Sequence, residues 1–191
     1  MAYSPDGALI ATGGDDGKVK VWTTKNCLCF TTFKDHEGGI TDITFLPKKS
    51  NAVLTSSEDG TVRAYDLIKY KCFRVMKPNK EGTPLTCLAV DQSGDVVSAG
   101  SKDPYNVYLW SLKTGLLLDI LAGHKAPISS ISFSNSSNGY LATSSWDNTV
   151  KIWDVFGKNG ILETFEHSSE VLSVKFNPSN PSEVITTTLS G

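Results

Sequence analysis

The sequence is poor in the features that mark several functional classes. Its 18 Lys and Arg residues nearly balance its 20 Asp and Glu residues, giving a formal net charge of −2 over 191 residues. This balance gives no reason to expect nucleic-acid binding through bulk electrostatic attraction. No apolar run approaches the length of a membrane span, and no signal peptide opens the chain. The length is sufficient for one domain with a sizeable core.

Cysteine is also scarce. The four residues Cys27, Cys29, Cys72 and Cys87 include no CxxC pair, which disfavours a zinc site or a disulfide framework. We expect reduced thiols in or near the core of an intracellular protein. Cys27 and Cys29 are two residues apart, so we expect them to share one face of a strand.

The sequence contains no catalytic motif. It has no nucleophile elbow, no phosphate-binding loop and no cluster of metal ligands. The pairs Gly13-Gly14 and Gly38-Gly39 are better interpreted as turn glycines of a β protein than as phosphate cradles. We therefore expect no enzyme activity, no cofactor, no bound metal and no small-molecule substrate.

What the sequence does contain is a repeated β pattern, clearest between Gly123 and Asp154. This stretch opens with Gly-His and closes with Trp-Asp. It holds three runs of β-forming residues, at 128–133, 140–145 and 149–153. A turn rich in Asn, Ser and Gly at 135–139 and a tight turn at Asp147-Asn148 separate the runs.

The same pattern recurs along the chain. The aromatic residues that close it, Trp22, Tyr65, Trp110 and Trp153, are 43, 45 and 43 residues apart. The other strands that we expect lie at 8–12, 18–22, 27–33, 40–45, 52–56, 61–65, 85–90, 95–99, 106–110, 171–176 and 183–187.

These repeats resemble the WD-repeat family, whose period is ~40–45 residues. The resemblance implies an all-β fold, a WD-repeat β-propeller with four-stranded antiparallel blades. The chain would form a single partial propeller, with about four and a half blades of an incomplete, seven-bladed ring. The expected blades span approximately 1–34, 35–79, 80–122, 123–165 and 166–191. Because so few blades cannot close a ring, we expect the chain to be part of a longer one or to associate through its open ends.

The resemblance also implies a hydrogen-bonded network in each blade, built from a His, a Ser or Thr, an Asp and a Trp. In the clearest repeat the four are His124, Thr143, Asp147 and Trp153. The corresponding residues are His36, Thr55, Asp59 and Tyr65 in the second repeat, and Thr12, Asp16 and Trp22 in the first. Such a set looks like a catalytic triad. Because it recurs in successive repeats, and a catalytic site would occur once, a structural role is the stronger interpretation.

Some repeats depart from this pattern. His167 and Thr186 keep the 19-residue spacing of His36 and Thr55, but Ser190 takes the place of the Asp. The third repeat lacks the His and has Ala99 where the hydroxyl belongs. We therefore expect the third blade to form no network and to be looser than its neighbours.

One candidate surface for partner binding lies on a rim of the propeller. The residue before each turn Asp should point to one rim face, which predicts a surface made of Asp15, Glu58, Lys102 and Trp146. An exposed Trp there would be a natural anchor for a partner. The alternative is that Trp146 packs over a loop of the neighbouring blade.

A second candidate surface is the basic stretch after the second repeat. Lys69, Lys71 and Arg74, continued by Lys77 and Lys80, are interleaved with aromatic residues and could meet RNA phosphates or an acidic partner. The alternative is a solvated outer strand whose lysines protect an edge.

Three segments resemble one group within the WD-repeat family more closely than they resemble the general repeat. They are 59–66 with 70–74, 93–100, and 107–119 leading into 123–128. Together they resemble a nucleolar group of eukaryotic WD-repeat proteins. That likeness implies a non-catalytic scaffold subunit of the small-subunit processome, in the nucleolus of the nucleus, whose partners are the proteins of a large ribonucleoprotein assembly. Contact with pre-rRNA or small nucleolar RNA is an open possibility, and no membrane partner is expected. The alternative is a substrate receptor or adaptor in a ubiquitin-ligase or signalling complex.

Overall fold

The computed structural model describes residues 1–135, 139–157 and 160–191. Within these ranges the chain forms eighteen β-strands and no helix. The expected turn at 135–139 lies largely outside the described residues. The strands form four four-stranded antiparallel sheets and one two-stranded sheet, which we number blades 1 to 5 in chain order. The prediction of an all-β, propeller-like fold is therefore confirmed.

The strands of each blade follow one another in sequence. Blade 1 contains β1 (Ala2–Tyr3), β2 (Leu9–Gly13), β3 (Val19–Thr23) and β4 (Cys29–Phe33). Blade 2 contains β5 (Ile40–Leu46), β6 (Lys49–Ser57), β7 (Val62–Asp66) and β8 (Lys71–Met76). Blade 3 contains β9 (Leu85–Val90), β10 (Val96–Ser101), β11 (Val107–Ser111) and β12 (Leu117–Leu121). Blade 4 contains β13 (Ile128–Phe133), β14 (Tyr140–Ser145), β15 (Thr149–Asp154) and β16 (Gly160–Glu166), and blade 5 contains β17 (Val171–Phe176) and β18 (Val184–Thr188).

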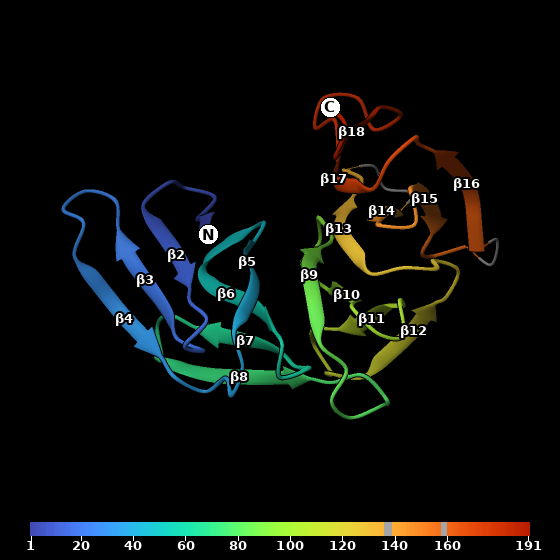
Figure 1. Cartoon of the computed structure of the whole chain (residues 1–191). Coiled ribbons are helices and arrows are strands. Elements are labelled where there is room, and N and C mark those ends of the chain that lie inside the picture. Colours follow the sequence, from blue (N-terminus) through green and yellow to red (C-terminus); the bar gives the residue numbers. More distant parts are fainter. Residues whose placement is uncertain (136–138, 158–159) are drawn as a thin grey trace.

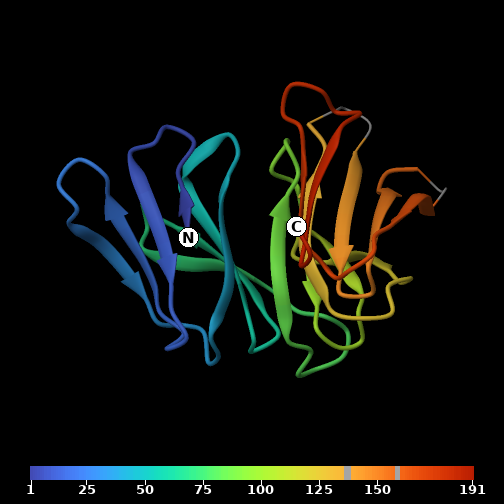
Figure 2. The same ribbon diagram turned by 45° about the horizontal axis from the view of Figure 1, so that its top comes forward.

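The blades are arranged side by side around an arc that is open between the first and the last (Figure 1). The innermost strands β5, β9, β13 and β17 lie next to one another along the inside of this arc. The outermost strands β4, β8, β12 and β16 lie on its outside. Figure 2, turned by 45°, shows that the connecting loops gather at the two ends of the sheets, which are the rims of the propeller.

Apolar packing between successive blades supplies the core. One buried cluster joins each pair of neighbours: Phe33 with Tyr65 between blades 1 and 2, and Leu54 with Trp110 between blades 2 and 3. Further clusters join blades 3 and 4 and blades 4 and 5. The alternation of side chains in each strand places apolar residues on both faces of a blade, so each blade is covered by the next.

Hydroxyl groups on the innermost strands tie the blades together at the backbone. Thr86 Oγ1 donates to the Ile128 carbonyl at 2.6 Å, and Ser129 Oγ donates to the Val171 carbonyl at 2.6 Å. Asp42 makes a different link, because its carboxylate accepts the Leu88 N–H at 2.9 Å. Burial raises the pKa of the Asp42 carboxyl.

The cysteines correct one expectation. Cys27 does not share a strand face with Cys29, because it lies in the turn before β4 with a positive φ of 56°. Both thiols are exposed and unbridged, whereas Cys72 is half-buried and Cys87 is buried. Burial raises the pKa of the Cys87 thiol to about 12, as expected for an unreactive core cysteine.

A glycine at the end of β10 permits the close approach of blades 3 and 4. A Cβ on Gly100 would lie 2.6 Å from Ile128 Cγ2 and 2.8 Å from Cys87 Sγ. We predict that Gly100→Val lowers the free energy of unfolding by about 1–3 kcal/mol through overpacking. Denaturant midpoints measure this effect. Gly100→Val and Ile128→Ala together should lower the free energy of unfolding by less than the sum of the two single changes, because the smaller side chain removes the clash. A double variant less stable than that sum would contradict the steric explanation.

Candidate functional site

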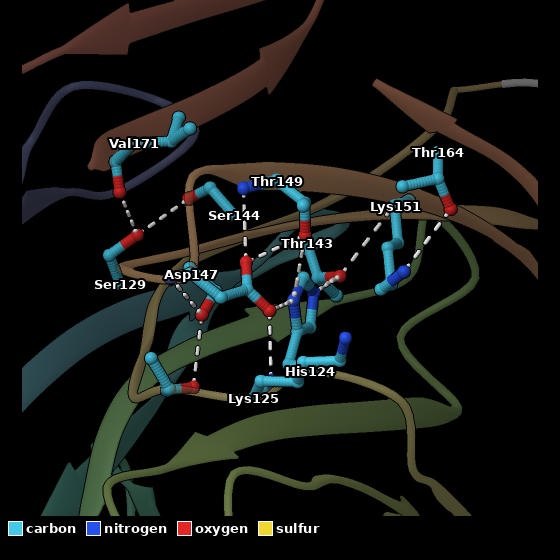
Figure 3. A network of polar contacts seen from close by, with 12 residues as sticks. His124, Lys125, Ser129, Thr143, Ser144, Asp147, Thr149, Lys151, Thr164 and Val171 are labelled. Carbon is cyan, nitrogen blue, oxygen red and sulfur yellow. Dashed lines mark hydrogen bonds and ion pairs between the residues drawn. The ribbon is translucent and has the colours of Figure 1, made fainter. Parts of the chain in front are cut away.

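The clearest polar network lies in blade 4 and joins four segments of the chain (Figure 3). His124 precedes β13, Thr143 lies in β14, Asp147 lies in the β14–β15 turn and Trp153 lies in β15. The indole N–H of Trp153 donates to Thr143 Oγ1 at 2.8 Å, and Thr143 Oγ1 lies 2.8 Å from His124 Nε2. His124 Nδ1 lies 2.9 Å from Asp147 Oδ2. The expected chain of hydrogen bonds is thus formed in full.

The Asp147 carboxylate is satisfied on both oxygens. Oδ2 also accepts the Lys125 N–H at 2.8 Å, and Oδ1 accepts the N–H and the hydroxyl of Thr149 at 3.0 and 2.6 Å. Burial alone would raise the pKa of Asp147, but these hydrogen bonds outweigh it and lower the pKa to about 2. The carboxylate therefore stays ionised at neutral pH.

The neighbouring imidazole stays neutral. Burial lowers the pKa of His124 more than the Asp147 carboxylate raises it. The neutral ring can then donate from Nδ1 to Asp147 and accept at Nε2 from the Thr143 hydroxyl, and Thr149 Oγ1 also lies 3.3 Å from Nδ1, so both ring nitrogens have partners. The network orients the ring and holds no free base or nucleophile.

Blade 2 repeats this arrangement with one change. His36 lies 2.7 Å from both Asp59 Oδ2 and Thr55 Oγ1, and burial again lowers the pKa of its imidazole. Tyr65 replaces the Trp, and its buried hydroxyl has no hydrogen-bond partner among the described residues. Its ring instead stacks on Phe33 of blade 1, with centroids 4.3 Å apart. Burial raises the pKa of the Tyr65 phenol.

Blade 1 contains part of the network. Trp22 Nε1 donates to Thr12 Oγ1 at 2.9 Å, as in blade 4. Asp16 departs from the expectation, because no His of this chain reaches it. Its carboxylate is exposed and forms an ion pair with Lys18 at 2.6 Å.

Blade 3 replaces the network with apolar packing. Trp110 is fully buried, and its indole N–H donates to the Lys77 carbonyl at 3.2 Å. Every residue of β10 is buried. In blade 5, His167 Nε2 is buried without a partner among the described residues, so Thr186 does not repeat the bond that Thr143 makes. The looser third blade stays a prediction.

Two network members were missed by the sequence analysis. Thr149 and its counterpart Thr61 bind the turn carboxylates. Ser145 and its counterpart Ser57 accept the N–H of Asp147 and Asp59. The spacing Ser-x-Asp-x-Thr, present in both repeats, was the available signal.

The four predicted rim residues line one funnel of about 540 Å³. Apolar residues at the start of the innermost strands also line it: Leu85 and Ile128 are buried and Ile40 is half-buried. Asp15 and Glu58 lie on one side, and neither forms an ion pair within the described part of the chain. Lys102 and Trp146 come from blades 3 and 4, and 53% of Trp146 is exposed.

Backbone hydrogen bonds hold the rim residues in place. Glu58, Lys102 and Trp146 donate their N–H groups to the carbonyls of Gly39, Pro84 and Pro127, at 2.9 to 3.1 Å. Leu189 makes the same bond to Glu170, and its side chain is exposed. Leu189 is therefore a fifth rim residue, which the sequence analysis missed because Ser190 stands where Asp was expected.

The basic stretch does not act as one surface. Lys69 and Lys71 are exposed, but Arg74 is half-buried between blades 2 and 3. Its guanidinium donates to the carbonyls of Lys113 and Thr114 at 2.7 and 3.2 Å. Arg74 was wrongly placed on the candidate surface, because these bonds turn its charge toward the neighbouring blade.

No helix among the described residues is long and apolar enough to cross a membrane. Within the same part of the chain, no three His, Cys, Asp or Glu side chains are grouped so as to hold a metal ion.

Comparisons with known proteins agree with this geometry. The family model described as "WD domain, G-beta repeat" matches residues 1–23, 27–66 and 115–154, which is more than half of the chain. The unmatched segment 67–114 holds the third repeat, whose network is missing.

Relatives named Periodic tryptophan protein 2 match most of the chain. The Dictyostelium discoideum homolog is 46% identical over 93% of this chain and 19% of its own length. The Saccharomyces cerevisiae protein is 44% identical over 100% of this chain and 20% of its own length. The chain thus spans about a fifth of these relatives. A guanine nucleotide-binding protein subunit beta of Arabidopsis thaliana is 30% identical over 79% of the chain and 41% of its own length.

The blade 4 network generates a prediction about stability. His124→Ala should lower the free energy of unfolding by about 1–3 kcal/mol, because it removes one donor from a buried carboxylate and the acceptor of Thr143. Urea denaturation measures this change. The matched control is Glu81→Ala, at the corresponding position of blade 3, which should have little effect. Equal midpoints for His124→Ala and the parent chain would contradict the network.

The buried histidines generate a prediction about pH. Because the folded chain lowers the pKa of His36 and His124 below 6.5, the unfolded chain binds protons there first. The urea midpoint should therefore fall as pH drops below 6.5, and again below 3.8, where the unfolded Asp147 is protonated before the folded one. Asp42 opposes the trend just above 3.8 because its folded pKa is raised. The double variant His36→Gln, His124→Gln should lose the first decline; an unaltered decline would exclude these histidines as its cause.

Proposed function

The chain belongs to the WD-repeat family, and we propose that it is the partner-binding part of a non-catalytic scaffold subunit that works in small ribosomal subunit biogenesis. The single observation that carries the scaffold role is the rim funnel. Four blades each contribute one side chain to it, and none of these four takes part in a blade network. The polar networks themselves are buried and satisfied, which supports a structural role for them.

The chemistry of the funnel favours a protein ligand. Two unpaired carboxylates, Asp15 and Glu58, can meet basic side chains of a partner, and Lys102 can meet an acidic one. Trp146 supplies a large exposed ring beside the half-exposed side chain of Leu172. Aromatic anchors surrounded by charged groups are typical of protein interfaces.

The assembly is proposed from likeness. Proteins named Periodic tryptophan protein 2 are 44–46% identical to the chain over most of its length. The nucleolar group that the sequence resembles consists of scaffold subunits of the small-subunit processome, so we place the protein in the nucleolus, among the proteins of that ribonucleoprotein assembly. Direct contact with pre-rRNA or small nucleolar RNA is part of this proposal.

A signalling adaptor is the second candidate. The observation that favours it is the 30% identity with a guanine nucleotide-binding protein subunit beta. Affinity purification of the full-length protein separates the two. Recovery of nucleolar processome proteins and pre-rRNA supports the first proposal, and recovery of signalling or ubiquitin-ligase adaptor proteins supports the second.

Trp146 allows a direct test of the rim. In cells that depend on the full-length protein, Trp146→Ala should reduce the recovery of assembly partners and slow maturation of small-subunit rRNA, because an interface anchor is lost. The matched control is Leu118→Ala, an exposed apolar residue on the outer strand β12. Normal rRNA levels after depletion of the whole protein would argue against the ribosomal role, whereas normal partner recovery by Trp146→Ala alone would argue only against the rim.

A further inference from the structure

The outer strands of blades 1 to 4 share an irregularity. In each of them one residue is skipped where the outer strand pairs with its neighbour, which is a β-bulge. The skipped residues are Phe30, Phe73, Leu118 and Leu162, all large, apolar and between 41 and 57% exposed. The bulge therefore turns one apolar side chain per blade toward the outside of the propeller.

The turn before each bulge also repeats. Its last residue has a left-handed backbone, and that residue is Cys27, Tyr70 and Gly115 in blades 1, 2 and 3, with φ of 56°, 52° and 78°. Glycine adopts this conformation without strain, as Gly115 does, whereas a tyrosine is destabilised by it. Blade 2 thus holds a large ring at a position where the backbone favours glycine.

Between blades 2 and 3, Phe73 and Lys113 line a groove of about 310 Å³ that is bordered by Arg74. Its guanidinium covers the turn of blade 3, and a Cβ on Gly115 would lie 2.8 Å from Arg74 Cδ. The residue that corresponds to Arg74 in blade 1 is Thr31, which pairs with Val21 as Arg74 pairs with Ala64. A threonine is too short to span the next groove.

Between blades 1 and 2, two rings lie in contact instead. Phe30 contacts Tyr70 with centroids 5.5 Å apart and planes tilted by 43°. The contact does not bury them, since 42% of Phe30 and 55% of Tyr70 stay exposed. Both blades here have four strands, so this aromatic pair is flanked by complete sheets on either side.

Two cationic side chains adjoin Tyr70 in the sequence, and both attract the Asp66 carboxylate electrostatically. Lys69 and Lys71 flank Tyr70 in sequence and are exposed, and neither forms an ion pair within the described ranges. The nearby Asp66 carboxylate accepts the N–H groups of Ile68 and Lys69 at 2.8 and 2.9 Å, so it faces its own turn. The side chain of Ile68 is also exposed.

We propose that this aromatic pair, with Lys69 and Lys71 beside it, binds an acidic segment of another protein that carries apolar anchors. The rings and Ile68 would cover the anchors, and the lysines would meet the carboxylates. A nucleic acid is a poorer match, because nucleic-acid interfaces are more polar and more strongly positive than two lysines beside two aromatic rings and Ile68. This surface is separate from the rim funnel and does not depend on it.

The probe is a short synthetic peptide in which Leu and Phe alternate with Asp and Glu. A peptide with Lys in place of each acid and an oligouridine RNA are the comparison ligands, and fluorescence anisotropy with the chain gives the dissociation constants. The acidic peptide should bind most tightly. Tyr70→Gly should weaken it by about tenfold or more, as for an interface hot spot, while leaving the denaturation midpoint unchanged or higher because backbone strain is relieved.

Three further variants locate the site. Tyr70→Asn, which also tolerates a left-handed backbone, should behave like Tyr70→Gly, and the double variant Lys69→Glu, Lys71→Glu should weaken the acidic peptide and favour the basic one. Phe73→Ser, at the bulge of the next groove, and Trp146→Ala, on the rim, should leave binding unchanged. Unaltered binding by Tyr70→Gly, loss of binding by Phe73→Ser instead, or preferential binding of the RNA would each overturn the proposal.

Discussion

Blades 2 and 4 each depend on one buried carboxylate, Asp59 or Asp147. In blade 4, Asp147 accepts hydrogen bonds from the Lys125 N–H, the His124 ring and both donors of Thr149, and so it joins the loop before β13 to the β14–β15 turn. A buried charge is expensive unless every lone pair is satisfied, so these partners act as a unit. The His124 imidazole is hydrogen-bonded in turn to Thr143 Oγ1, which also accepts the indole N–H of Trp153. Each hydrogen bond adds little net stability, whereas breaking one of them leaves a buried polar group unsatisfied and costs more free energy.

Blade 3 shows that the fold can do without this carboxylate. Trp110 keeps its place in the sheet and donates to the Lys77 carbonyl instead of to a hydroxyl. With Ala99 at the network position of β10 there is no hydroxyl to satisfy at that point, and the strand packs against apolar residues of blade 2. Replacing both partners of a polar pair by apolar groups is far less destabilising than removing one of them. Tyr65 in blade 2 is an intermediate case, since its ring is stacked but its hydroxyl lacks a partner among the described residues.

The sequence predicted the inner strands of the blades and the networks of blades 2 and 4 from short, repeated patterns, but the outermost strands β8, β12 and β16 were not among the expected ranges. The repeated apolar pattern of Ile128, Ile131 and Phe133 and the 19-residue spacing of His124 and Thr143 depend on contacts within one repeat. Predictions failed where the outcome depended on a neighbouring blade or an irregular backbone. Arg74 looked like a surface cation, but the carbonyls that it binds lie about forty residues further on. Cys27 looked like a strand residue, but a left-handed turn precedes the strand. A positive φ leaves no mark in an apolar periodicity.

The β14–β15 turn buries the side chain of Asp147 and exposes that of the preceding residue, Trp146. Asp147 is held inward by its donors, and the Trp146 N–H is held by the Pro127 carbonyl, so the Trp146 side chain is forced to the rim on a fixed backbone. This backbone bond recurs at Lys102, whose N–H donates to the Pro84 carbonyl in blade 3, where no network is formed. The backbone rather than the network therefore fixes the rim position, and Glu58, Lys102 and Trp146 occupy equivalent places with different chemistry. The outer turns follow the same logic, since a backbone that accepts Gly115 in one blade presents Tyr70 in another. The exposed side chains that differ from blade to blade therefore lie at positions outside the buried networks.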